Sequence, residues 1–268
     1  MDPHAICHFG GAGLAACINF PLWRAAAIGQ SGFTIEGKTV FERYWKALSP
    51  STMPYRGVMA VMLGMTWARG AIFYGSDKGK VYLLERGWTA PLAQTLPPLV
   101  CSTLVQFVNM PIVRSSVTIQ DPKSKYSSVT EAIVAIYKRK GVSGLWHGVS
   151  AGILKTVPKY ITAVVVKDYM EENLPAVDPN DGNAILVRSA VKSSAAGLAG
   201  AALTNPLDVL RNEMFKTDLG LSATYKKLMS ESGWGFMLRG MAPNCTAVAI
   251  PIAITIFFTD VLERYIGK

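Results

Sequence analysis

Three sets of residues recur along this chain with a period of about ninety, and this repetition constrains the fold more than any single motif does. Three prolines lie 90 and 95 residues apart: Pro21, Pro111 and Pro206. Three short steps, each ending in glycine, lie 91 and 92 residues apart: "PYRG", "LWHG" and "MLRG", ending at Gly57, Gly148 and Gly240. Three aspartates follow those glycines by 20 residues each: Asp77, Asp168 and Asp260. Such a period predicts three copies of one supersecondary unit that pack against one another.

The chain is too apolar for an ordinary soluble domain of 268 residues, because 50% of it is hydrophobic and only 17% is charged. Three stretches lack Asp, Glu, Lys and Arg and are long enough to cross a bilayer as helices: 3–23, 87–113 and 240–259. Three more apolar segments carry isolated bases, as expected for helices with one face on a polar interior: 58–76, 149–167 and 183–210. The sequence therefore predicts an all-α membrane protein with six transmembrane helices. The alternative is a soluble all-α protein with very apolar helices.

Each repeat is expected to hold two long helices joined by a short amphipathic helix, which gives a single domain with pseudo-threefold symmetry. The repeats cover residues 1–86, 87–178 and 179–268. The amphipathic pieces are clearest at 129–141 and 225–233. A proline inside a spanning helix removes one backbone hydrogen bond and kinks the helix, and small residues allow close helix contact.

The distribution of basic residues predicts the orientation. The segments after the first, third and fifth helices hold 15 of the 27 Lys and Arg residues. This asymmetry places both termini on the side opposite the basic loops. Anionic lipid headgroups explain the net charge of +9 without any nucleic acid.

Metal and catalytic sites are not expected. The four cysteines lie in apolar segments without metal-ligand spacing, so they read as small buried hydrophobes: Cys7, Cys17, Cys101 and Cys245. His4 and His8 share a helical face but have no third ligand in view. No nucleophile with a base and no phosphate-binding loop is present, so an enzyme is not predicted. The first apolar run lacks a basic segment before it, so no cleavable leader is predicted.

The repeat, together with "NPLDVLR" and "KGVSGLWHG", resembles the mitochondrial carrier family over nearly the whole chain. The resemblance implies a protein of the mitochondrial inner membrane with both termini in the intermembrane space and no cofactor. It also implies cardiolipin bound at the aromatic–base–glycine steps. The corresponding residues are Tyr55, Arg56 and Gly57, then Trp146, His147 and Gly148, and finally Arg239 and Gly240.

The resemblance further implies a matrix-side gate in which acids and bases of successive odd-numbered helices form ion pairs. The pairs at the matching positions are Trp23 with Ser116, Val113 with Arg211, and Asp208 with Ala26. None of them is an ion pair. The glutamines that brace this gate in the family are present as Gln30 and Gln120, and Phe215 takes the third place.

Two further arginines, Arg24 and Arg114, lie one residue beyond the acid positions of the gate. Because one residue turns a helical side chain by about 100°, they do not replace the acids directly. We expect them to extend to matrix-side headgroups, or alternatively one of them to form a substitute bridge with Asp208.

The gate on the intermembrane side is also unusual in charge. The matching pairs are Asp77 with Glu171, Asp168 with Glu263, and Asp260 with Lys80. Two of these pairs are of like charge, and only the last is attractive. Lys167 and Arg264 are near enough in sequence to compensate.

The positions at which family members contact substrate carry little charge here. They are Gly64 and Met65, Lys155 and Thr156, and Ala247 and Val248. Lys155 is the charged member, and a nucleotide or tricarboxylate would require more positive charge. Pro158 is the kink residue of the second even-numbered helix, whereas Trp67 stands where the first would have its proline.

These departures favour a carrier-fold protein that has lost solute exchange and serves as a structural subunit of a larger inner-membrane assembly, such as a respiratory complex. The alternative is an active transporter of a small, weakly charged solute or a monocarboxylate by alternating access.

Overall fold

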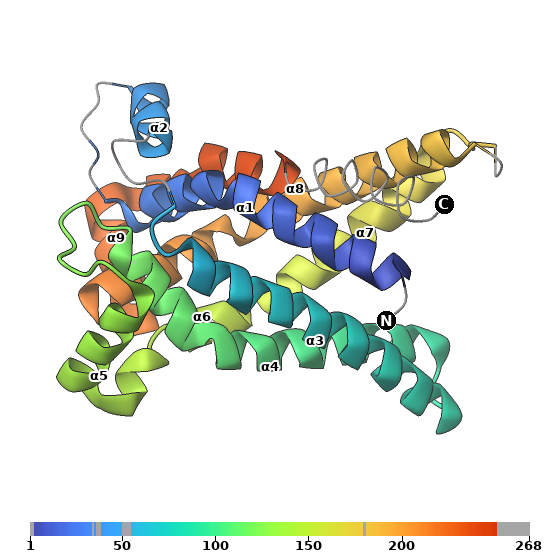
Figure 1. Ribbon diagram of the computed structural model, residues 1–268, viewed down its shortest axis with the longest axis horizontal. Coiled ribbons are helices and arrows are strands. Elements are labelled where there is room, and N and C mark those ends of the chain that lie inside the picture. Colours follow the sequence, from blue (N-terminus) through green and yellow to red (C-terminus); the bar gives the residue numbers. More distant parts are fainter. Residues whose placement is uncertain (1–2, 34, 36–38, 50–54, 179–180, 251–268) are drawn as a thin grey trace. The chain divides into compact units, whose positions relative to one another are not determined.

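The computed structural model describes residues 3–33, 35, 39–49, 55–178 and 181–250. All regular structure within these residues is helical, which confirms the predicted all-α class. The elements, labelled in Figure 1, are α1 (Pro3–Ser31), α2 (Val40–Leu48), α3 (Val58–Glu85), α4 (Ala90–Ile119), α5 (Val129–Leu145), α6 (Val149–Leu154), α7 (Thr156–Asn173), α8 (Gly182–Thr217), α9 (Leu221–Ser232), the 3-10 helix η2 (Gly233–Leu238) and a last helix over 241–250. Asp260 and Glu263, expected on the intermembrane side, lie outside the described residues.

The chain forms two compact units. Unit 1 comprises 1–55, 158–209 and 234–268, and unit 2 comprises 56–157 and 210–233. Helices α7 and α8 each contribute residues to both units.

The repeated prolines lie inside helices, as the sequence predicted. Pro21 is within α1, Pro111 within α4 and Pro206 within α8. Pro158 behaves differently, because the helix ends at Leu154 with Lys155 as its C-cap and a new helix begins at Thr156. A proline cannot donate its backbone N–H to the preceding turn, so the break lies one turn before it. The expected kink at Pro158 is therefore a junction between α6 and α7.

Helices α3 and α4 pack closely along their length in unit 2 (Figure 1). A Cβ atom placed on Gly75 would lie 2.7 Å from Cys101 Sγ, and one on Gly79 would lie 2.6 Å from the Pro97 Cβ. Glycines spaced by four residues thus let the two helices approach more closely than side chains would allow.

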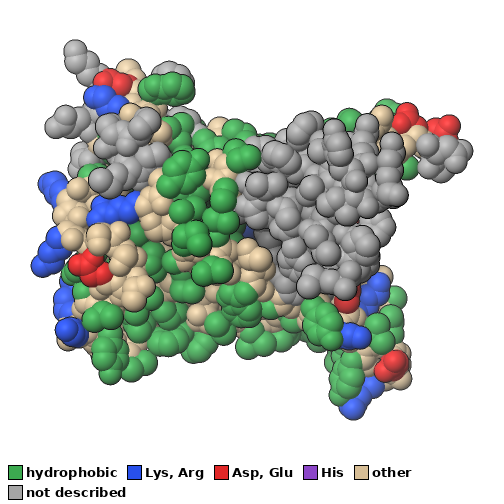
Figure 2. Space-filling view, viewed as in Figure 1, with side chains coloured by type: hydrophobic (Ala, Val, Ile, Leu, Met, Phe, Trp, Pro, Cys, Tyr) green, Lys and Arg blue, Asp and Glu red, His purple; other side chains and the backbone are tan. Residues whose placement is uncertain are grey.

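Within the described residues, one helix, α4, is long and apolar enough to cross a membrane. Val58–Ala68, in α3, is a shorter apolar segment. Figure 2 shows hydrophobic side chains over the surface of α3 and α4. They include exposed Leu63, Leu96, Val100 and Leu104. A continuous exposed apolar surface of this kind fits contact with lipid.

The short helices begin at hydrogen-bonded caps. The Thr39 hydroxyl accepts a hydrogen bond from the Glu42 N–H at the start of α2, and Ser128 does the same for Glu131 at the start of α5. Helix α5 is kinked at Gly141, whose φ is 69°, where the amphipathic segment was expected to end. Helix α9 begins four residues before the expected segment, at Leu221.

Candidate functional site

The three glycine steps have the same backbone conformation. Gly57, Gly148 and Gly240 have φ of 81°, 88° and 68°. Each carbonyl accepts a hydrogen bond from the N–H four residues later, so each glycine begins a helix. Glycine adopts a positive φ without the steric cost that a side chain brings.

In unit 2, the first step contacts the end of α4. The Gln120 side-chain amide donates a hydrogen bond to the Arg56 carbonyl at 3.0 Å, and a Cβ on Gly57 would lie 2.5 Å from Ile119 Cδ1. The Arg56 guanidinium donates to the carbonyls of Ser124 and Tyr126, in the segment that follows α4.

The second step, also in unit 2, makes equivalent contacts with α8. A Cβ on Gly148 would lie 2.6 Å from Phe215 Cε1. The His147 ring nitrogen Nε2 lies 2.9 Å from the Leu219 carbonyl oxygen, in the segment that follows α8. Trp146 donates its indole N–H to the Phe107 carbonyl at 2.9 Å.

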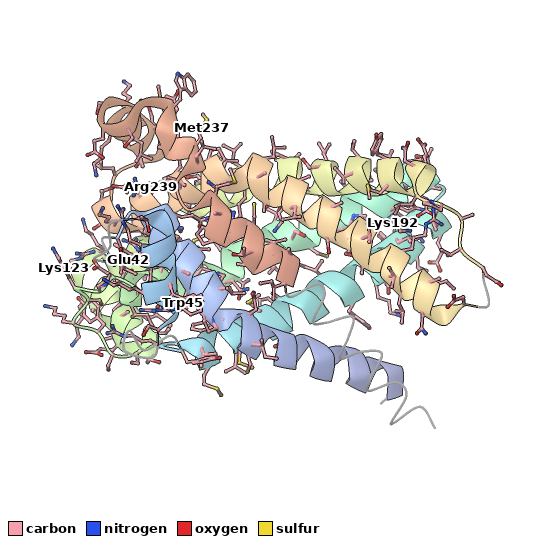
Figure 3. All side chains as sticks on the ribbon, turned by 90° about the horizontal axis from the view of Figure 1, so that it is seen from above. Glu42, Trp45, Lys123, Lys192, Met237 and Arg239 are labelled. Carbon is pink, nitrogen blue, oxygen red and sulfur yellow. The ribbon has the colours of Figure 1, made fainter. Side chains whose placement is uncertain are left out.

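The third step, in unit 1, contacts the end of α1. A Cβ on Gly240 would lie 2.9 Å from Gln30 Cγ, and the Arg239 guanidinium packs against Gly32, just after α1. Gln30 donates to the Asn205 side chain at 3.0 Å. Figure 3 shows Arg239 beside α2.

We call these three sets of contacts the glycine junctions. Each joins a glycine step to a brace residue at the C-terminal end of α1, α4 or α8, and to the segment that follows the same helix. The brace residues Gln30, Gln120 and Phe215 and the glycine steps were expected to serve two separate purposes, but the structure brings them together. No local sequence signal pairs them, although their common period does.

A cavity of about 420 Å³ lies beside the third junction in unit 1. Apolar residues of α1, α2 and the segment around Gly240 form most of its wall, and two cations, Arg43 and Arg239, also line it. This combination fits a ligand with acyl chains and an anionic headgroup.

Arg24 and Arg114 are buried, so the expectation that they extend to lipid headgroups is wrong. Arg24 is 4% exposed and donates to the Ala47 carbonyl at 2.9 Å, near the end of α2. Arg114 is 1% exposed and donates to the Gly144 carbonyl, near the end of α5. The last carbonyls of a helix lack partners within the helix and carry its negative dipole, so they attract these cations.

Arg114 also forms an ion pair with Asp218, a residue that the sequence did not single out. Arg139 and Lys140 lie 3.0 and 3.8 Å from the other carboxylate oxygen of Asp218. A second unforeseen pair joins Glu213, which is 1% exposed, to Lys227 at 2.7 Å. Both acids follow the "NPLDVLR" motif, and nothing in their spacing indicates which cation they meet.

Of the six remaining positions expected at the matrix-side gate, three are buried and three are partly buried. Ala26 and Asp208 are buried in unit 1, and Trp23 packs on Phe20 with ring centroids 5.4 Å apart. In unit 2, Val113 is partly buried. There Ser116 is fully buried and its hydroxyl makes no hydrogen bond among the described residues. Arg211 lies 5.9 Å from the Phe215 ring centroid.

Among the residues expected at the intermembrane-side gate, Glu171 has cationic neighbours that the sequence did not identify. Arg188 lies 3.1 Å from one carboxylate oxygen, and Lys192 contacts the other. Arg188 also donates to the Glu171 carbonyl at 2.8 Å. Two bases of α8 thus neutralise the acid that was expected to face a like charge. Asp77, Lys80 and Asp168 are exposed.

The positions expected to contact substrate differ in their surroundings. The Gly64 carbonyl accepts a hydrogen bond from Asn109 at 3.1 Å, and Trp67 donates to the Asn109 oxygen at 2.7 Å. Lys155 and Thr156 are 9% and 8% exposed and lie where α6 meets α7. The Ala247 carbonyl accepts a hydrogen bond from Asn19 at 3.0 Å. Met65 and Val248 are partly buried.

Comparison with known proteins finds a family model and relatives that match this chain. The family model "Mitochondrial carrier protein" matches residues 88–177 and 184–268. The chain is 22% identical over 216 residues to the mitochondrial ornithine transporter 1 of Saccharomyces cerevisiae, covering 76% of this chain and 74% of that protein. It is 25% identical over 211 residues to the adenine nucleotide transporter BT1 of Zea mays, covering 71% of this chain but only 47% of that protein.

A third relative is the mitochondrial uncoupling protein 6 of Arabidopsis thaliana, with 26% identity over 231 residues, 80% of this chain and 66% of that protein. Members of this family are transporters and not enzymes. The family model covers more than half of the chain, so the protein belongs to the mitochondrial carrier family.

Proposed function

We propose that this protein transports a small solute with a single or weak negative charge across the mitochondrial inner membrane by alternating access. The observation that carries the proposal is the burial of Lys155 where α6 meets α7, at a position where family members contact substrate. An ionisable side chain buried within a membrane protein is costly and is commonly functional. The related ornithine and adenine nucleotide transporters support transport as the general activity.

The charge of the contact positions limits the solute. Lys155 can pair with one carboxylate or a similar anionic group, and Thr156 beside it offers a hydroxyl. The other contact positions are Gly64, Met65, Ala247 and Val248, which bring no charge. A monocarboxylate fits this set better than a nucleotide does.

Uptake by the purified protein in liposomes, measured over a panel of monocarboxylates, dicarboxylates, amino acids and nucleotides, tests the proposal. We expect saturable uptake of a monocarboxylate, and a loss of at least about tenfold in Lys155→Met, because the ion pair with the solute is removed. Lys159→Met is the matched control, since Lys159 lies four residues later and is exposed. No uptake of any solute, or equal loss in the two variants, would contradict the proposal.

A second candidate is a protein that no longer exchanges solute and acts as a structural subunit of a larger inner-membrane assembly. The hydrogen bonds that join Asn109 to Gly64 and Trp67 favour it, because they hold α3 against α4 at a substrate-contact position. Comigration of the chain with a larger complex on native gels of mildly solubilised mitochondria, together with no uptake in liposomes, would support this candidate over transport.

We also propose six spanning helices with both termini in the intermembrane space, on the basis of the basic-loop asymmetry. A cysteine at position 124, in the basic segment after α4, tests the orientation. An impermeant maleimide should label Ser124→Cys in inverted inner-membrane vesicles and leave it unlabelled in mitoplasts. Labelling in mitoplasts would reverse the proposed orientation.

Cardiolipin is the ligand that we propose for the cavity beside the third junction, since Arg43 and Arg239 supply charge for phosphates and the apolar wall supplies contact for acyl chains. Added cardiolipin should raise the melting temperature of the delipidated protein, and the increase should be smaller in Arg239→Gln. An equal increase with zwitterionic phosphatidylcholine would contradict a specific site.

A further inference from the structure

The ion pair between Arg114 and Asp218 joins, within unit 2, the third and fifth of the spanning helices expected from the sequence. Arg114 is on α4, and Asp218 directly follows α8. Arg114 is 1% exposed and Asp218 is 20% exposed, so the pair is shielded from water on the arginine side. Shielded pairs with good geometry are strongly coupled, and the loss of one member leaves an uncompensated buried charge.

The backbone at Asp218 suggests that the carboxylate has a specific role. Its φ of 58° is left-handed, and its N–H donates to the Met214 carbonyl at 2.9 Å, as in the αL ending of a helix. Glycine fits this conformation best, whereas aspartate adopts it at some cost. The ion pair offsets that cost, which a glycine could not do.

The carboxylate of Asp218 is the negative charge that three neighbouring cations share. Arg139 and Lys140 of α5 lie 3.0 and 3.8 Å from one carboxylate oxygen, and Arg114 contacts the other. Without the carboxylate, the buried guanidinium of Arg114 would face two like charges. Neutralising Asp218 should therefore drive α4 and α5 away from the end of α8.

We propose that the Arg114–Asp218 ion pair is the gate contact that closes the bundle between α4 and α8 at the C-terminal ends of these helices. The family's gate would pair Val113 of α4 with Arg211 of α8, and these two residues cannot form an ion pair. The Arg114–Asp218 pair connects the same two helices, with its base on α4 and its acid just after α8. As a step in a transport cycle this inference rests on the proposed function, but the closure itself can be measured without transport.

The test uses Ser116, which is fully buried on α4, as a reporter of closure. Ser116→Cys is introduced into the full chain after the four native cysteines are replaced by serine. The rate of reaction with a membrane-impermeant maleimide is then measured from each side of membrane vesicles. If the ion pair closes the bundle, Asp218→Asn should react at least about tenfold faster from the side of the basic loops, and the parent should react slowly.

Two further variants keep the test decisive. Glu231→Gln is the matched control, because it neutralises an acid in an exposed pair with Lys227 and should leave the rate unchanged. Arg114→Gln combined with Asp218→Asn removes both charges, so it should fold even if Asp218→Asn does not. The double variant should also react faster than the parent, because the closing ion pair is absent.

Equal labelling rates in the parent and in both Asp218 variants would overturn the inference. A lower melting temperature without faster labelling would also overturn it, because the ion pair would then only stabilise the fold. Uptake separates this outcome from failure of the proposed function. If the parent takes up no solute, the proposed function fails while the labelling rates still decide whether the pair closes the bundle. If the parent transports and labelling is unchanged, only the gate assignment fails.

Discussion

The side-chain amide of Gln120 donates a hydrogen bond to the backbone carbonyl of Arg56 at 3.0 Å. Gln120 ends α4, and Arg56 immediately precedes the glycine that begins α3. The bond thus connects one repeat to the start of the second helix of the repeat before it. Gln120 is 1% exposed, so water cannot replace the bond if it is lost.

Gln120→Met should lower the free energy of unfolding by about 0.5–1.5 kcal/mol, because the shape is nearly kept while the partly buried Arg56 carbonyl loses its partner. Thermal unfolding in detergent, followed by a thiol-reactive or intrinsic fluorescence signal, measures the change. Gln94→Met, on the exposed face of α4, serves as the control and should change the melting temperature little. Matching decreases in the two variants would mean that the junction bond contributes nothing specific.

Gly148→Ala should be among the most destabilising single-methyl substitutions in unit 2. The added Cβ would lie 2.6 Å from the Phe215 ring, and the backbone φ is 88°. Positive φ costs roughly 1 kcal/mol for alanine, and overpacking adds about 1–3 kcal/mol. Gly87→Ala isolates the first cost, since Gly87 has φ of 79° but nothing within 4 Å of its Cβ position. If both variants melt at the same temperature, the packing of Phe215 on Gly148 is not tight.

The repeat predicted those parts of the fold that depend on backbone geometry. A proline removes a backbone donor wherever it lies, and a glycine permits positive φ, so Pro21 and Gly57 could be read directly from the sequence. The helix break near Pro158 was expected as a kink, because sequence alone does not distinguish a bent helix from two abutting ones.

Side-chain partners were less predictable, because they depend on helix rotation and on the path of short segments. Arg24 and Arg114 were placed correctly on their helices, but helix-end carbonyls as their partners leave no mark in the sequence. Asp218 was missed because its importance comes from a left-handed backbone and from cations more than seventy residues away. The family pattern marks the gate positions, whereas the ion pairs of Arg114 with Asp218 and of Glu213 with Lys227 lie beside them.

Acidification should weaken the start of α5 through Glu131. Its carboxylate accepts hydrogen bonds from the Ser127 N–H and hydroxyl, at 2.8 and 2.9 Å. The Ser127 backbone hydrogen bond, which is the largest cause, lowers the pKa of Glu131 below the usual value for glutamate. A lowered folded-state pKa means that this stabilisation is fully present above the unfolded-state pKa, about 4.3, and is lost as the pH falls through the folded-state value.

The difference in melting temperature between the parent and Glu131→Gln should accordingly shrink as the pH is lowered from about 5 to well below 4.3. Other titrating groups cancel in this difference, so no correction for them is needed. A difference that stays constant over this range would show that Glu131 is not held by its charge.

Arg24 and Asp208 should prove energetically coupled in unit 1. Both are charged and buried, with 4% and 8% of their surface exposed, and a buried charge is tolerated only when an opposite charge or several hydrogen bonds compensate it. The Ala47 carbonyl provides Arg24 with one hydrogen bond. Asp208 is the acid that the sequence offered as its substitute partner on α8.

A double-mutant cycle with Arg24→Gln and Asp208→Asn measures this coupling. Each single variant should melt clearly below the parent, and the double variant should lose less than the sum of the two by about 1 kcal/mol or more, because removing both charges avoids leaving one buried alone. Arg24→Gln combined with Glu171→Gln is the additive control, since Glu171 has its own partners in Arg188 and Lys192. Additive losses for Arg24 and Asp208 would assign Asp208 to another partner. Strong coupling would instead mean that two arginines, each one residue past the family's acid position, connect helices through acids that the family's gate pairs do not assign to them.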